Sequence, residues 1–191
     1  IAASAATTLN FANSASLTLD AVTAAGLTTI TATGAGTLAL GDLATLGALT
    51  TVTAGGASGP VSAEINASGN TFSFTGGSGN DTVTLDSATL GTNAKVDGGG
   101  GSGDVIVANF ALAADLALGS TTQITGFEIL GLGANADSNG FNFNAAGFNG
   151  ITLGATAGDI TLIDAKAGAT LAITATNANV ISYALQTDTA N

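Results

Sequence analysis

Apolar residues recur along the chain with a period of about 22 residues. The clearest series lies in the first half and steps by 22 residues each time: Ile30, Val52, Phe74 and Val96. Polar or small residues flank each of them, and this alternation is typical of a strand with one buried face. A second apolar pair follows after a turn in each repeat, at Leu17/Leu19, Leu38/Leu40, Val61/Ala63, Val83/Leu85 and Val105/Val107. The pattern predicts two short strands per repeat.

Repeats of this kind predict an all-β fold: a parallel β-helix or β-roll solenoid with coils of about 20–23 residues. A single coil cannot bury its apolar face, whereas coils stacked about 4.8 Å apart pair every strand with its neighbours and share one core. We expect coils over 1–108, an irregular insertion or register change over 109–150, and resumed coils over 151–191. In that last part, apolar positions return at Ile151/Leu153, Ile160/Leu162, Leu171/Ile173 and Val180, with Ile160 and Val180 taken as equivalent.

The composition restricts the chemistry of the chain. Thirteen acidic residues stand against two lysines, with no arginine, histidine or cysteine, and the net charge is −11. Such a chain repels nucleic acid and anionic membrane. No apolar run approaches the roughly 18 residues of a membrane span, and no basic n-region of a signal peptide is present, so we expect no membrane span and export by another signal. Without imidazole, thiolate or guanidinium groups we expect no enzyme.

A glycine-rich turn carries the most specific motif. Residues 76–84, GGSGNDTVT, match the G-G-x-G-x-D-x-U-x nonapeptide, and residues 99–107, GGGSGDVIV, are similar. Glycines permit a tight turn whose carbonyls point inward, and the aspartate adds a charged oxygen, which suits a hard cation such as Ca²⁺. The alternative is a pair of turns that bind nothing. The candidate metal ligands are Gly76, Gly77, Ser78, Gly79, Asn80, Asp81, Asp97, Gly99, Gly101, Gly103 and Asp104.

These turns resemble the calcium-binding repeats of the RTX family, also called hemolysin-type repeats. The resemblance implies that calcium lies between equivalent turns of successive coils, here the turns that end at Asp81 and Asp104. Together with the acidic, Ala/Thr/Gly-rich composition, the chain resembles RTX-type bacterial surface-layer proteins. That resemblance implies a secreted structural protein that assembles with copies of itself into a lattice on the cell surface, with lipopolysaccharide bound through another domain. An RTX adhesin segment, or the β-roll of a secreted RTX hydrolase or toxin, is the alternative.

Two further series follow the repeat. Acidic residues recur at intervals of 22 at Asp20, Asp42, Glu64 and Asp86. They are either solvated turn residues or a second cation-binding column, because stacked like charges repel unless water or cations screen them. Hydroxyl side chains alternate with the inward residues at Thr29/Thr31, Thr51/Thr53 and Ser73/Thr75. They are either ordinary exposed strand residues or a flat ice-binding ladder.

Overall fold

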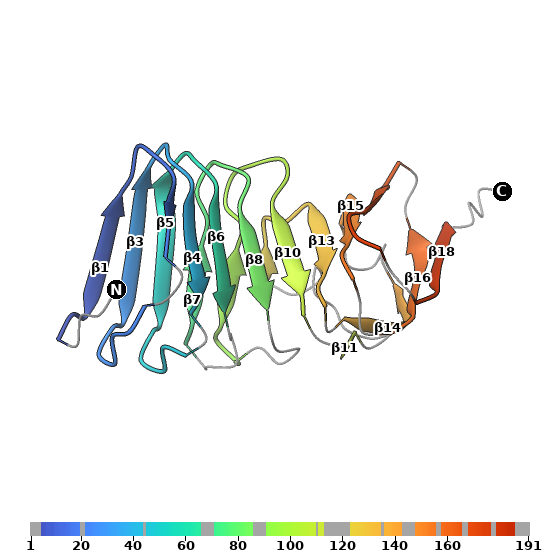
Figure 1. The fold of residues 1–191 in the computed structure, drawn as a ribbon, viewed down its shortest axis with the longest axis horizontal. Coiled ribbons are helices and arrows are strands. Elements are labelled where there is room, and N and C mark those ends of the chain that lie inside the picture. The colour runs from blue at the N-terminus through green and yellow to red at the C-terminus, as the bar shows by residue number, and fades with distance from the viewer. Residues whose placement is uncertain are drawn as a thin grey trace.

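The computed structural model is a stack of parallel β coils, which confirms the predicted solenoid (Figure 1). It describes residues 5–19, 22–43, 45–65, 71–85, 91–109, 111–112, 123–134, 136–142, 148–155, 158–165, 168–176 and 179–185. All regular elements in this part of the chain are strands, and all strand pairs are parallel. Each strand therefore pairs with the equivalent strand of the next coil.

One sheet runs through the whole described stack, and we call it the spine sheet. Its eight strands are β2 (Leu17–Thr18), β4 (Leu38–Asp42), β6 (Val61–Ile65), β8 (Thr82–Leu85), β10 (Val105–Ala108), β13 (Ile129–Leu132), β15 (Gly150–Leu153) and β17 (Thr170–Ile173). The pairs that fix its register are Leu17 with Leu38, Leu38 with Val61, Ser62 with Thr82, Thr82 with Val105, Val105 with Ile129, Ile129 with Gly150, and Gly150 with Thr170. The coils are thus close to the predicted length, and the one between β10 and β13 is slightly longer.

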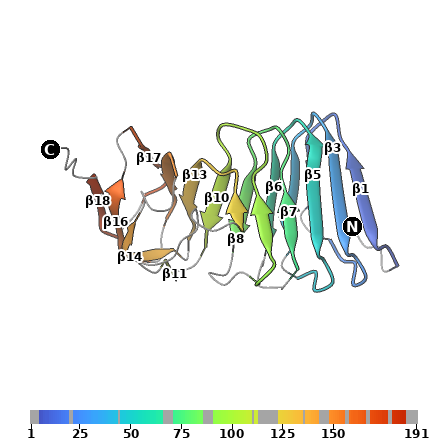
Figure 2. The same ribbon diagram turned by 180° about the vertical axis from the view of Figure 1, so that it is seen from behind.

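A second sheet, the N-terminal side sheet, faces the spine sheet across the core of the earlier coils (Figure 2). Its strands are β1 (Thr8–Ala12), β3 (Thr29–Gly34), β5 (Thr51–Ala57), β7 (Ser73–Thr75), β9 (Lys95–Asp97) and β12 (Ile124–Thr125). The 22-residue series is confirmed, because Ile30 pairs with Val52, Val52 with Phe74, and Phe74 with Val96. The hydroxyl residues between them form ladders in the same register on the half-exposed outer face.

Segment 109–150 changes the cross-section of the stack. The N-terminal side sheet ends at β12, and a C-terminal side sheet begins with β11 (Ala111–Leu112) and continues through β14 (Asp137–Asn142), β16 (Ile160–Ala165) and β18 (Ile181–Leu185). Ile124 pairs with Val96 although 28 residues separate them. The described strands of this segment therefore belong to the stack, and the period fades because the chain exchanges one side sheet for another.

Mainly small and medium aliphatic side chains, with a few phenylalanines, fill the space between the sheets. Phe74 and Leu38 are fully buried, and on the third side of an early coil Leu43, Leu46 and Leu49 close the core. Because the strands are only two to seven residues long, each coil is stabilised by the ladder and core that it shares with its neighbours.

Three of the predicted inward positions do not face the core: Val105, Val107 and Val180. A fourth, Ile173, pairs with the buried Leu153 but is itself 57% exposed. Val83 pairs with Ile106, so Ile106 and Ala108 are buried whereas Val105 and Val107 lie on the outer face. One extra residue in the preceding turn reverses the faces of the strand, because the side-chain period of a strand is two. Ile160 pairs with Ile181, and the neighbouring Val180 is 62% exposed.

We expect Phe74→Ala to lower the free energy of unfolding by about 3–5 kcal/mol, because the ring is completely buried and its loss leaves a cavity between coils. Urea unfolding followed by far-UV circular dichroism measures this. Thr75→Ala, on the outer face of the same strand, is the matched control and should cost less than about 1 kcal/mol. Equal losses in the two variants would contradict the assignment of faces.

Candidate metal centre in the acidic corner

The two glycine-rich turns lie next to each other in successive coils. The first connects β7 to β8 and the second connects β9 to β10, at the corner between the N-terminal side sheet and the spine sheet. Main-chain hydrogen bonds join them: Gly76 N donates to Asp97 O (2.8 Å), and Gly100 N donates to Gly77 O (2.7 Å). The predicted one-coil offset between the turns is thus correct.

Asp81 is a fully buried residue, and each oxygen of its carboxylate accepts one backbone N–H. Its Oδ1 accepts the N–H of Val61 in the preceding coil (2.7 Å), and its Oδ2 accepts the N–H of Gly77 in its own turn (2.6 Å). These two bonds compensate part of the cost of removing the carboxylate from water. Asp81 therefore ties its turn to the coil before it.

Asp104 is equally buried but only half satisfied. Its Oδ1 accepts the N–H of Asp81 (2.7 Å), whereas its Oδ2 has no hydrogen-bond partner among the residues that the structure describes. A buried carboxylate oxygen without a partner is costly and rare in native proteins. This oxygen is the strongest indication of a ligand in the corner.

The difference between the two aspartates follows from turn length. Thr75 pairs with Asp97 before the turns and Thr82 pairs with Val105 after them, so residues 76–81 form the first turn and residues 98–104 the second, which is one residue longer. In the longer turn Gly99 N donates to Asp97 Oδ1 (3.2 Å), and Gly100 N donates to the first turn. Neither glycine N–H is left for Asp104 Oδ2.

The electrostatic environment also differs between Asp81 and Asp104. Burial raises the pKa of Asp81, and the hydrogen bonds from Gly77 and Val61 offset part of that effect. Burial also raises the pKa of Asp104; the Asp81 N–H acts in the opposite direction, and the charges of Glu128, Asp81 and Asp97 raise the pKa further. A cation at this corner would relieve both the desolvation and the repulsion.

Three oxygens converge beside Gly101. A side-chain carbon at this position would lie 2.8 Å from Gly79 O and 2.9 Å from both carboxylate oxygens of Asp104. One carbonyl from the first turn and one carboxylate from the second therefore face a common point, as a hard cation that binds oxygen requires. These donors fit Ca²⁺.

The other candidate ligands have different positions. Asn80 contacts the second turn, where its Oδ1 accepts Ser102 N–H (3.4 Å) and its side chain lies beside Gly103. Ser78 is exposed. Gly76 packs against Gly98 O of the next coil, and Gly99 has a φ of 92°, which a side chain would strain. No three acidic side chains within the described ranges form a metal-binding group by themselves, so main-chain carbonyls would have to complete the coordination.

Glu128 is a corner residue that the sequence interpretation missed. Asp104 N donates to its Oε2 (3.0 Å), and the strand register stacks Glu128 on Asp104 as it stacks Asp104 on Asp81. A recurring pattern of an acid two residues before a buried residue could have revealed it: Asp81/Val83, Asp104/Ile106 and Glu128/Leu130. Glu128 does not follow a glycine nonapeptide, and it therefore escaped the motif.

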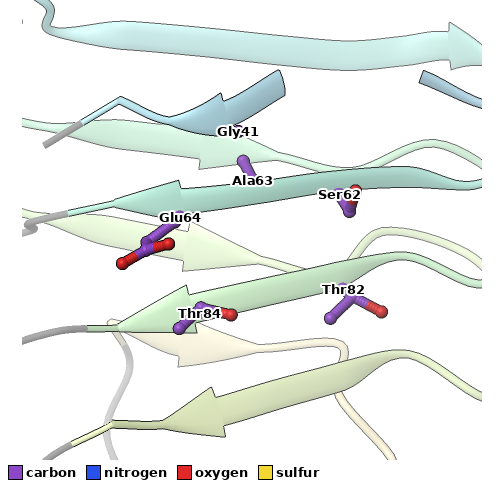
Figure 3. A pocket seen from close by; sticks show the side chains of 6 residues that line it. All are labelled: Gly41, Ser62, Ala63, Glu64, Thr82 and Thr84. Carbon is purple, nitrogen blue, oxygen red and sulfur yellow. The ribbon is translucent and has the colours of Figure 1, made fainter. Parts of the chain in front are cut away.

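The 22-residue acidic series is only partly aligned. Asp42 pairs with Glu64, but Glu64 then pairs with Thr84 rather than continuing the interval, and Asp20 and Asp86 lie outside the described residues. A hollow of about 190 Å³ lies on this face of the spine sheet, lined by Gly41, Ser62, Ala63, Glu64, Thr82 and Thr84 (Figure 3). Because Glu64 stacks on Thr84, the expected column of four carboxylates does not continue beyond Glu64.

The fold and the site define a parallel β-solenoid with a buried acidic corner. No protein-family model matches the chain, and the comparison with curated proteins gives no significant match. Within the described ranges, no helix has the length and apolar character of a membrane span.

We expect Asp81→Asn and Asp104→Asn to differ in the metal-free chain. An asparagine at position 81 keeps one acceptor and places an NH₂ group against the N–H of Val61 or Gly77, which should cost about 1–3 kcal/mol. An asparagine at position 104 keeps the acceptor for Asp81 N–H and removes a buried charge, so stability should be unchanged or higher. Urea unfolding in the presence of EDTA measures both. A loss for Asp104→Asn as large as that for Asp81→Asn would contradict the assigned hydrogen bonds.

Proposed function

We propose that this chain is a calcium-stabilised structural segment of a secreted bacterial surface layer. The observation that supports calcium most directly is the buried Asp104 Oδ2, which lacks a partner among the described residues and faces the same point as Gly79 O. Calcium binds both carboxylate and carbonyl oxygens. It tolerates irregular coordination geometry, whereas magnesium demands a near-ideal octahedron. The corner offers such a mixed set of ligands.

The proposed mechanism links calcium to the stacking of coils. In the metal-free chain, the charges of Asp81, Asp97, Asp104 and Glu128 oppose the close approach of successive turns. An ion bound between the turns would compensate for this repulsion and for the desolvated Asp104 oxygen. Calcium would then favour the stacked state over the open one, because a ligand that binds only the folded chain stabilises it by mass action.

The surface-layer role rests on the repetitive scaffold, the acidic composition and the RTX-type turns. A linear stack of coils presents long, regular faces, which suits a building block of a lattice. The net charge of −11 would keep the chain soluble before assembly and would make contacts between copies depend on cations. We propose a role without catalysis, in which the solenoid itself is the functional element.

We expect calcium to raise the melting temperature of the chain by roughly 5–10 °C at a calcium concentration about 100 times the dissociation constant. Thermal unfolding followed by circular dichroism, with calcium and with EDTA, measures this. Gly101→Ala should abolish the shift, because its methyl group would occupy the point where Gly79 O and the Asp104 carboxylate converge. Gly100→Ala is the matched control, since its nearest contact is 3.9 Å away and its conformation is ordinary. A shift that persists in Gly101→Ala would exclude this site.

We also expect purified chain to form ordered two-dimensional sheets when calcium is added, and to remain dispersed in EDTA. Negative-stain electron microscopy tests this, with Gly101→Ala as the variant that should not respond. Monomers that remain dispersed in calcium but adhere to immobilised glycans or to a receptor would instead support an adhesin segment.

A further inference from the structure

Three carboxylates at the corner form a continuous ladder. Each reaches back one coil and accepts the N–H of the equivalent corner residue: Asp81 accepts from Val61, Asp104 from Asp81, and Glu128 from Asp104. The last of these bonds, at 3.0 Å, is part-buried. Glu128 therefore has the same relation to the second turn as Asp104 has to the first.

Glu128 occupies this position at the end of a much shorter connection. Only residues 126–128 separate β12 from β13, whereas seven residues form the preceding turn. Gly126, with a φ of 72°, brings the chain close enough that a side-chain carbon there would lie 2.6 Å from Asp97 Oδ1. The extra methylene of glutamate compensates for the missing loop and lets the carboxylate reach Asp104 N–H.

The charges at this corner are unbalanced. Asp81, Asp97 and Glu128 all act electrostatically on Asp104, which is completely buried and has an oxygen without a partner in the described chain. The chain contains only two lysines and no arginine, and Lys95 is exposed on the outer face of β9. This concentration of negative charge around one unpaired oxygen would favour a divalent cation there.

We propose that Glu128, which lies outside the glycine-rich turns, is the third charged residue of the cation site at Asp104. This inference rests on the proposed calcium function and extends it by one coil. Glu128 acts as a positioning and charge-supplying residue: it holds the Asp104 backbone through the N–H bond and increases the affinity for a divalent cation. One ion thereby connects three coils, those of Asp81, Asp104 and Glu128.

The location of Glu128 gives this connection a structural consequence. Its coil contains β12, the last strand of the N-terminal side sheet, and β13, whose Ile129 N donates to Asp104 O (3.0 Å). Calcium bound at Asp104 should therefore protect the amides of β13 as well as those of β10 from hydrogen exchange. A site confined to the two glycine-rich turns would protect β8 and β10 only.

The test uses calorimetric titration of the 191-residue chain with CaCl₂. Glu128→Gln keeps an acceptor for Asp104 N–H but removes the charge, and it should weaken calcium binding about tenfold. Glu128→Asp keeps the charge with a shorter reach and should bind more tightly than Glu128→Gln. Asp159→Asn is the matched control, because Asp159 Oδ1 also accepts an N–H from a neighbouring coil (Val180, 2.8 Å) but lies just before β16, at the C-terminal side sheet and away from the acidic corner. Its affinity should equal that of the unmodified chain.

The outcomes separate the two proposals. Absence of calcium binding to the unmodified chain would overturn the proposed function together with this extension. Normal binding to the unmodified chain and to Glu128→Gln, or weaker binding to Glu128→Asp than to Glu128→Gln, would overturn the role of Glu128 alone. Should Glu128→Gln unfold in EDTA, the calcium concentration for half-maximal refolding replaces the calorimetric constant. A half-maximal calcium concentration equal to that of Asp159→Asn would likewise overturn the role of Glu128 alone.

Discussion

The structure depends on the main-chain ladder of the spine sheet. Its strands are too short to be stable alone, and it is the one sheet that continues through every described coil while the side sheets replace each other. The turns therefore absorb most changes in coil length without disturbing this ladder; among the described spine strands, only β4 and β6 shift register, between Ala39 and Asp42. They do so at the corner that precedes the spine strands, where connections of different length lead to Thr82, Val105 and Ile129 in strict register. The acids that precede these residues stack because the strands after them are paired.

This constraint has an electrostatic cost, since it places carboxylates on top of one another in a region that excludes water. The chain reduces the cost by giving each acid the N–H of the corner residue one coil earlier. Asp81 gains a second N–H from its own turn, but the longer turn before Asp104 directs its glycine N–H groups elsewhere. The longer of the two turns thus ends in a carboxylate with one oxygen that has no partner among the described residues, although the two motifs look nearly the same in sequence.

The period of the apolar residues predicted the coils correctly because inward positions such as Ile30 and Phe74 pair at a constant interval of 22 residues. The same reasoning failed at Val105 and Val107, where the insertion shifts the strand by one residue and exposes the other face. The sequence also suggested the same role for Asp81 and Asp104. The structure distinguishes them by their hydrogen bonds, and bonds to N–H groups that are distant in the chain have no local signature in the sequence. Glu128 was missed for a related reason: no glycine nonapeptide precedes it, and its stacking on Asp104 follows from the pairing of β10 with β13.

The acidic corner lies where the side sheets are exchanged. There β12 pairs with β9, and β11 with β14, over two residues each, while β10 pairs with β13 over four. The contact between Asp104 and Glu128 adds to these short ladders. So does the side chain of Gln123, which donates to Gly91 O (2.7 Å) and Ala94 O (3.0 Å). A cation at Asp104 would therefore act on an interface built from several small contacts. Because cooperativity in a linear stack depends on the interfaces between neighbouring coils, such an ion would strengthen the coupling between the coils before and after the exchange.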